Sequence, residues 1–96
     1  MELVVSGKAR SDLLRIYRYL EERSPSAADA FGRRIDANFA NLVRFPFIGR
    51  ERSWLAPGIR CLVAGHHLIF YLVDSEQITV VRVIDARMDV DEEFYR

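Results

Sequence analysis

The sequence has one cysteine, three prolines and one tryptophan in 96 residues. A single cysteine excludes a disulfide within the chain and the repeated cysteine spacing of a zinc finger. Cys61 falls in an apolar segment, so we interpret it as a small buried thiol, compatible with a reducing cytoplasm. Net charge is absent as well, because 14 basic residues balance 14 acidic ones. An overall attraction to nucleic acid or to a membrane surface is therefore not predicted.

Long apolar runs and familiar catalytic motifs are also missing. No segment approaches the roughly 20 apolar residues of a membrane-spanning helix. The start, MELVV, is short and lacks the basic residues of a secretion signal, so we expect a cytoplasmic protein. The chain contains no phosphate-binding loop, nucleophile elbow or HExxH motif. We accordingly predict no cofactor and no metal site.

The region 59–85 is rich in valine, isoleucine, phenylalanine and tyrosine, which favour strands. Gly65 and the pair Asp74-Ser75 interrupt this region. Three strands joined by tight turns, and hence an antiparallel meander, are predicted. Strict alternation in the last strand would place four side chains on one face: Ile78, Val80, Arg82 and Ile84.

A first amphipathic helix is predicted after a short strand over residues 1–6. Ser6 can accept hydrogen bonds from the free N–H groups of the first helical turn, so it is the expected N-cap. Pro25 cannot continue a helix, which should therefore end near Arg23. The apolar residues recur at helical spacing and form one stripe: Ala9, Leu13, Ile16, Tyr17 and Leu20.

A second amphipathic helix follows at once, so the two should form an antiparallel hairpin over residues 7–45. Ser26, with Asp29 three residues later, resembles a capping box and is its predicted start. This helix should stop before Pro46. Its apolar stripe consists of Phe31, Ile35, Phe39 and Leu42.

These elements predict a single α+β domain over residues 1–96, in the order β-α-α-β-β-β. The antiparallel helical hairpin should pack on a mainly antiparallel sheet, because its two apolar stripes need a cover. Residues 46–58 are rich in proline and glycine and are predicted to be a loop. Within it, Trp54 is expected to anchor the loop to the core, with a binding hot spot for a partner as the alternative. Residues 86–96 form an acidic tail that either docks through its aromatic residues or stays mobile.

Charge is distributed unevenly along the chain. Residues 33–60 contain six arginines and two acids, and residues 85–96 contain five acids and two arginines. A solvated surface is one reading, and a basic surface that meets an acidic partner or phosphates is the other. Arg82 lies in an apolar strand, where it either pairs with an acid such as Asp85 or Asp89 or joins a binding surface. His66 and His67 lack further ligands for a metal, so we interpret them as exposed turn residues.

Several short motifs occur in a consistent order along nearly the whole chain. They are Ala9-x-x-Asp12-Leu13-x-x-Ile16-x-x-Tyr19, Phe45-Pro46-x-x-Gly49, Gly58-Ile59-Arg60, Leu68-Ile69-Phe70-Tyr71 and Val81-Arg82-Val83-Ile84-Asp85-Ala86-Arg87-Met88-Asp89. Together they resemble the RelE/ParE superfamily of bacterial toxin–antitoxin modules, and more closely its ParE branch. The resemblance implies a growth-inhibiting toxin that is held inactive by an antitoxin encoded beside it. It implies mRNA cleavage in the ribosome for the RelE branch, and inhibition of DNA gyrase for the ParE branch.

The residues that RelE-type nucleases use are incompletely matched. Such toxins carry lysines and arginines on the sheet and a tyrosine or histidine near the C-terminus, and here Arg60, Arg87 and Tyr95 are the nearest matches. Leu68 stands where an arginine is expected, and Asp85 where relatives can carry a histidine. The incomplete set favours a ParE-like toxin that inhibits gyrase by binding and is not an enzyme. The alternatives are a ribosome-dependent mRNA endonuclease and an inactive toxin that acts as co-repressor with its antitoxin.

The resemblance implies a ParD-like or related antitoxin and DNA gyrase as partners, with a toxin–antitoxin hetero-oligomer. We expect the contacts with a partner to include Arg60, Arg82, Arg87 and Trp54. Neither membrane binding nor direct nucleic-acid binding without the antitoxin or the target is expected. Since the helices cover only one side of the sheet, apolar surface and strand edges should remain open to an antitoxin helix or strand.

Overall fold

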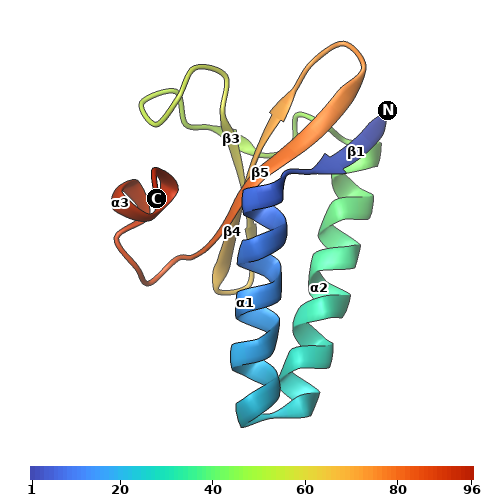
Figure 1. The fold of residues 1–96 in the computed structure, drawn as a ribbon. Coiled ribbons are helices and arrows are strands. Elements are labelled where there is room, and N and C mark those ends of the chain that lie inside the picture. Colours follow the sequence, from blue (N-terminus) through green and yellow to red (C-terminus); the bar gives the residue numbers. More distant parts are fainter.

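The computed structural model describes residues 1–96 as one five-stranded sheet with a helical hairpin on one face (Figure 1). The elements are β1 (Glu2–Val5), α1 (Gly7–Arg23), α2 (Pro25–Arg44), β2 (Arg50–Glu51), β3 (Arg60–Ala64), β4 (His67–Val73), β5 (Gln77–Asp85) and α3 (Val90–Phe94). The strand order is β1-β5-β4-β3-β2, in which β1 runs parallel to β5 and the remaining pairs are antiparallel. The predicted α+β class and order of elements are confirmed, and β2 and α3 are short additions.

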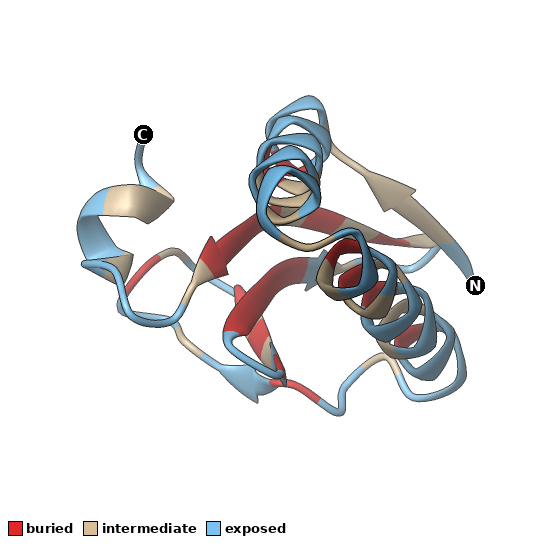
Figure 2. Ribbon diagram, turned by 90° about the horizontal axis from the view of Figure 1, so that it is seen from below, coloured by how far each residue is buried: buried red, intermediate tan, exposed pale blue.

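The first helix begins and ends where the sequence predicts. The Ser6 Oγ accepts the N–H of Ala9 at 3.1 Å, and the helix ends at Arg23. Its apolar stripe and that of α2 pack together on one face of the sheet and form the main core. Figure 2 shows the buried residues concentrated on the strands and on the helix sides that face them.

The predicted start of the second helix at Ser26 is wrong. The N-cap is Ser24, whose Oγ accepts the N–H of Ala27 at 3.3 Å, and Pro25 occupies the first turn. Proline suits this position because its fixed φ is already helical and its missing N–H would have had no partner there. The proline that ends α1 therefore also starts α2, and Asp29 closes no capping box.

A β-bulge in β5 changes which side chains share a face. The ladder between β4 and β5 shifts at Val81, an extra residue without a partner in β4. Before the bulge Val80 packs in the helix-side core, and after it Val83 does. Ile84 belongs to a core on the opposite face. The unbroken alternation predicted over residues 78–84 is therefore wrong, because one inserted residue reverses it.

The face of the sheet away from the hairpin is not left open. It carries a second core of six buried residues: Leu55, Ile59, Cys61, Leu68, Phe70 and Ile84. Leu55 covers it from the loop before β3, and Phe94 of α3 places its ring 5.3 Å from that of Phe70. The expected bare sheet face is therefore wrong, whereas the buried Cys61 is confirmed. Burial raises the pKa of the Cys61 thiol.

Trp54 does not anchor its loop. Its side chain is 68% exposed, while its neighbour Leu55 is only 4% exposed and packs in the second core. The apolar residue that the loop buries is thus one position away from the predicted one. The predicted anchor is therefore wrong, and a contact of Trp54 with a partner stays a prediction.

Candidate partner-binding surfaces

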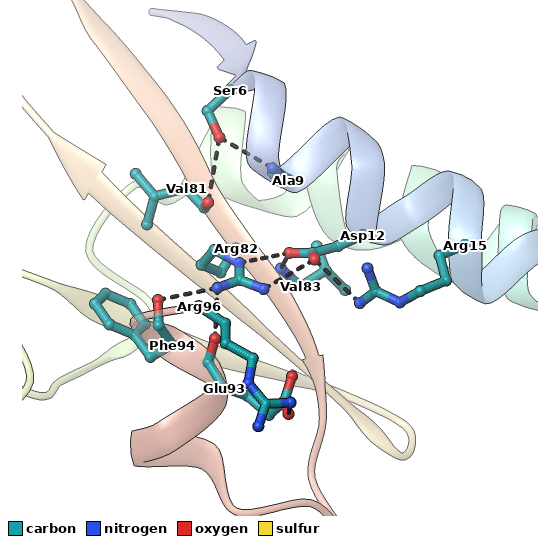
Figure 3. Close-up of polar contacts among 10 residues, drawn as sticks. All are labelled: Ser6, Ala9, Asp12, Arg15, Val81, Arg82, Val83, Glu93, Phe94 and Arg96. Carbon is teal, nitrogen blue, oxygen red and sulfur yellow. Dashed lines mark hydrogen bonds and ion pairs between the residues drawn. The ribbon is translucent and has the colours of Figure 1, made fainter.

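A buried ion pair joins α1 to β5 (Figure 3). The Arg82 Nε donates to Asp12 Oδ2 at 2.8 Å, and Nη2 donates to Asp12 Oδ1 at 3.0 Å. Two parallel bonds of this kind match the planar guanidinium to a carboxylate. The side chains of Arg82 and Asp12 are only 7% and 2% exposed. The predicted pairing of Arg82 with Asp85 or Asp89 is wrong, and its actual partner lies 70 residues away in the sequence.

Asp12 also completes the edge of β5. The pairing with β1 covers only residues 77–80 of β5, so the later N–H groups on this side have no strand beside them. Asp12 Oδ2 accepts the N–H of Val83 at 2.9 Å and takes the place of a strand partner. Burial would raise the pKa of Asp12, but hydrogen bonds from Arg82 and Val83 outweigh it and lower the pKa below its usual value. Asp12 is therefore an ionised carboxylate at neutral pH.

The opposite side of Arg82 holds α3. Its Nη1 donates to the main-chain oxygens of Glu93 and Phe94, so one guanidinium links α1, β5 and α3 (Figure 3). The pKa of Arg82 is raised because Asp12 accepts its hydrogen bonds. Every guanidinium nitrogen of Arg82 is bonded within the chain, which favours the structural reading of this residue over a partner contact.

A trough runs along α1, between this helix and the C-terminal segment. Its polar half encloses about 530 Å³. Four basic residues line it together with the acids Asp12 and Glu93, and they are Lys8, Arg15, Arg82 and Arg96. Its apolar half encloses about 310 Å³ and is lined by Ile16, Tyr19, Leu20, Ile84 and Met88. The halves are continuous, since Arg15, Met88 and Glu93 line both.

His67 lines the apolar half of the trough and corrects another prediction. It is only 8% exposed, its ring packs edge-on against Phe31 at 4.9 Å, and its buried Nδ1 has no hydrogen-bond partner. Burial lowers the pKa of His67, so the imidazole is neutral at pH 7. The prediction of an exposed turn histidine is correct for His66 and wrong for His67, because β4 begins at His67 and turns its ring into the core.

Arg87 lies at the rim of the trough. Its Nη2 contacts Asp85 Oδ2 at 2.6 Å, and its side chain is 73% exposed. The hydrogen bond from Arg87 lowers the pKa of Asp85 to about 2. The predicted partner contact of Arg87 stays a prediction, and a partner at this rim would meet a neutralised Asp85–Arg87 pair and not a free cation.

A second candidate surface is the segment 44–60, which we call the arginine–aromatic loop. The guanidinium of Arg60 lies 5.0 Å from the ring of Phe47, and that of Arg52 lies 5.3 Å from the ring of Trp54. Phe47 is 64% exposed, close to the value for Trp54. Exposed aromatic rings with arginines over them are typical of the residues that dominate protein interfaces.

Internal hydrogen bonds define the shape of the arginine–aromatic loop. Arg60 Nη1 donates to the main-chain oxygens of Gly49 and Phe47, at 2.8 and 3.3 Å. The N–H of Gly49 donates to the buried Tyr71 Oη at 2.8 Å. A Cβ on Gly49 would stand 2.6 Å from that oxygen, so only glycine permits this approach. Burial raises the pKa of Tyr71, which stays a neutral phenol.

The residues expected for a nuclease do not converge. Arg60 pairs across the sheet with Tyr71, whereas Arg87 follows the end of β5, where Asp85 pairs with His67. Tyr71 and His67 are four residues apart on β4, so the two arginines are attached about 13 Å apart along the strand direction. Tyr95 is 67% exposed at the end of α3. No group of three or more His, Cys, Asp and Glu is placed to hold a metal ion, and no helix is both long and apolar enough to cross a membrane.

Comparison with known proteins identifies the family. Residues 3–90 match the family described as "ParE toxin of type II toxin-antitoxin system, parDE". The chain belongs to the ParE family. Toxin ParE3 of Caulobacter vibrioides is 34% identical over 80 residues, which cover 82% of this chain and 80% of that protein. Toxin ParE1 of Mycobacterium tuberculosis is 53% identical over 47 residues, which cover 48% of each chain.

A solved structure shares the fold of this chain. The structure titled "Chromosomal ParDE TA system from P. aeruginosa" superposes with a TM-score of 0.77 at 23% identity, and covers 91% of this chain and 97% of that one. The family match and the similarity to Toxin ParE3 confirm the ParE branch inferred from the sequence motifs, and this chain is a ParE-type toxin component of a type II toxin–antitoxin system.

Proposed function

We propose that this ParE-family toxin inhibits DNA gyrase by binding to it, and that a cognate antitoxin neutralises the toxin by binding in turn. Family membership supports the class of target, because the ParE branch is the gyrase-directed branch of the superfamily. The chemistry of the surface supports inhibition by binding.

The observation that carries the proposal is the separation of Arg60 from Arg87. Metal-free RNA cleavage needs a base for the 2′-hydroxyl, an acid for the leaving oxygen and cations on one phosphate. Here Arg60 bonds to loop carbonyls and Arg87 to Asp85, and the two are attached about 13 Å apart along the strand direction. Tyr95 is on a third element, α3. The arrangement supports docking better than proton transfer at one phosphate.

The test is a supercoiling assay with purified toxin, gyrase and relaxed plasmid. We expect supercoiling to fall as toxin is added and to recover when the antitoxin encoded by the adjacent gene is added. Gyrase that remains fully active at a large excess of folded toxin would refute the proposal.

Two further assays separate the alternatives. Primer extension on cellular mRNA after induction should show no codon-phased cuts, and such cuts would establish the nuclease instead. Expression of the chain alone should arrest growth. Harmless accumulation of folded protein would indicate the co-repressor.

A further inference from the structure

We infer that the trough beside α1 binds one segment of the antitoxin, with a carboxylate side chain in its polar half and a bulky apolar side chain in its apolar half. The inference rests on the antitoxin partnership proposed above and not on the identity of the target. It assigns the partner to this surface and leaves the arginine–aromatic loop free.

The polar half selects for negative charge. Its two acids are already neutralised, since Asp12 is bonded by Arg82 and Arg15, and Glu93 by Arg96. Lys8 has no ion-pair partner, and the side chain of Arg15 is 62% exposed with a single bond to Asp12. Lys8 and Arg15 are two helical turns apart and so lie on the same side of α1. A carboxylate between them would meet the unpaired ammonium of Lys8 and an Arg15 guanidinium that makes only one bond, to Asp12.

The apolar half selects for a large hydrophobic side chain. Tyr19 and Met88 are among its lining residues and are 55% and 51% exposed. Its volume of about 310 Å³ is at the lower end of the roughly 300–1,000 Å³ of known ligand pockets. At its inner wall the neutral ring of His67 has no internal hydrogen-bond partner at Nδ1. An apolar side chain would thus bury exposed surface of Tyr19 and Met88, beside the guanidinium of Arg23 that lies 3.6 Å from the Tyr19 ring.

The spacing of the two halves sets the length of the segment. From Asp12 to Tyr19 the helix rises about 10 Å, which an extended peptide spans in about three residues. The expected ligand therefore carries an acidic residue and a bulky apolar residue about three positions apart. An enclosed small molecule is less suitable, because the trough is open along its length and changes character from one end to the other.

The first experiment maps a model ligand on the full chain by NMR. The probe is the peptide Ser-Glu-Glu-Gly-Leu-Phe-Ser, with one control that has lysine for both glutamates and another that has alanine for the Leu-Phe pair. We expect amide shifts at Lys8, Arg15, Tyr19 and Met88 with the probe and much smaller shifts with either control. Shifts that map to the arginine–aromatic loop, or no shifts at millimolar probe, would overturn the inference.

The second experiment uses the antitoxin encoded by the adjacent gene and measures its affinity for toxin variants by calorimetry. Lys8→Glu and Tyr19→Ala change exposed trough residues that make no ion pair, and each should weaken binding at least tenfold. The matched controls are Arg18→Glu and Leu14→Ala, which are exposed on α1 outside the trough. Unchanged affinity for both trough variants would overturn the inference. A loss confined to Leu14→Ala would do the same and would place the antitoxin on the outer groove between α1 and α2, which Leu14 lines.

The two proposals can fail separately. If the toxin leaves gyrase active but the trough variants no longer bind the antitoxin, gyrase is refuted as the target and antitoxin binding in the trough is supported. If gyrase is inhibited but the trough variants bind the antitoxin normally, the target stands and the trough is refuted.

Discussion

The Asp12–Arg82 pair and the arginine–aromatic loop use the same type of side chain in opposite ways. Arg82 is enclosed, and all of its nitrogens bond to acceptors in the chain. Arg60 and Arg52 lie over exposed aromatic rings and pair with no acid. In the first region the charge holds three elements together, whereas in the second it remains available to a partner.

This difference shows that the role of an arginine in this fold depends on the element opposite to it. Arg82 lies on the part of β5 that β1 does not cover, so α1 must supply the acceptor that a strand would have supplied. Arg60 lies near the short β2, where no helix closes over it, and its acceptors are loop carbonyls. Whether an arginine is buried therefore depends on which element lies beside its strand, and not on the local sequence.

The largest effect is expected from removing Asp12. Asp12→Ala would leave a buried guanidinium and the N–H of Val83 without their acceptor, which should lower the free energy of unfolding by about 3–5 kcal/mol. Urea unfolding of the variant and the wild type measures this directly. Asp36→Ala is the matched control, because this aspartate is exposed and makes no ion pair, and its stability should change little. Equal stability of the two variants would show that the pair is dispensable.

The next largest effect is expected at Gly49. Gly49→Ala would place a methyl group 2.6 Å from Tyr71 Oη and 2.9 Å from the carbonyl oxygen of Cys61. Overpacking of this kind should cost about 1–3 kcal/mol of unfolding free energy. Gly32→Ala is the control, since a Cβ there meets nothing within 4 Å and the change should be neutral or stabilising in a helix. Full stability of Gly49→Ala would mean that the loop can move away from β4.

Acid should destabilise the fold over a defined range. A carboxylate with a lower pKa in the folded than in the unfolded protein stabilises the fold above its unfolded pKa, and this stabilisation is lost as the pH falls toward the folded pKa. Asp12 has a lowered pKa, and that of Asp85 is about 2. We expect the unfolding free energy to decline as the pH is lowered from about 4 toward 2, measured by denaturant titrations at several pH values. Asp85→Asn should reduce this decline without abolishing it, because Asp12 remains.

His67 should add a weaker dependence at higher pH. Its pKa is lowered by burial, so the unfolded chain takes up the proton first, and stability should begin to fall below about pH 6.5. Asp85, which faces the ring from β5, opposes this shift, while Arg34, Arg87 and His66 act in the same direction as burial. His67→Phe should flatten the stability between about pH 6.5 and 5, and His66→Phe should not. Identical pH profiles for the two variants would contradict the buried neutral ring.

The smallest effect on stability is expected at Trp54. Because its side chain is exposed, Trp54→Ala should change the unfolding free energy by less than about 0.5 kcal/mol. Binding should respond differently. If the arginine–aromatic loop contacts gyrase, loss of the exposed tryptophan should weaken the affinity for gyrase by about 2 kcal/mol or more. A supercoiling titration of the variant checks this. Unaltered inhibition would show that the arginine–aromatic loop is not the target surface.

Much of the fold could be predicted because its signals are local. The apolar stripes of α1 and α2 have helical spacing, Ser6 caps the first helix, and the turn at Gly65 separates two largely apolar strands. The errors also have local causes that the sequence does not reveal. Ser24 rather than Ser26 caps α2 because proline fits the first helical turn, and one unpaired residue, Val81, reverses the alternation of β5.

The candidate site was predicted less well because it depends on contacts between distant parts of the chain. In the sequence Asp12 stands out only as part of a motif, although it lies three residues after Ala9 and four before Ile16, on the same side of the helix, and a lone strand arginine could be its partner. The burial of His67 and the trough beside α1 follow from how α3 and the end of β5 lie against α1, which no spacing rule indicates.

The sequence by itself determined the helical hairpin, the meander and membership of the ParE branch, because periodicity, turn residues and ordered motifs act over short distances. The tertiary structure decided which arginine is enclosed, which histidine is neutral and where two halves of a trough meet. Those properties depend on the short pairing of β1 with β5, over residues 77–80 only, and on the packing of α3 against β5. Such arrangements balance the desolvation of charges against bonds that form only when the chain is folded.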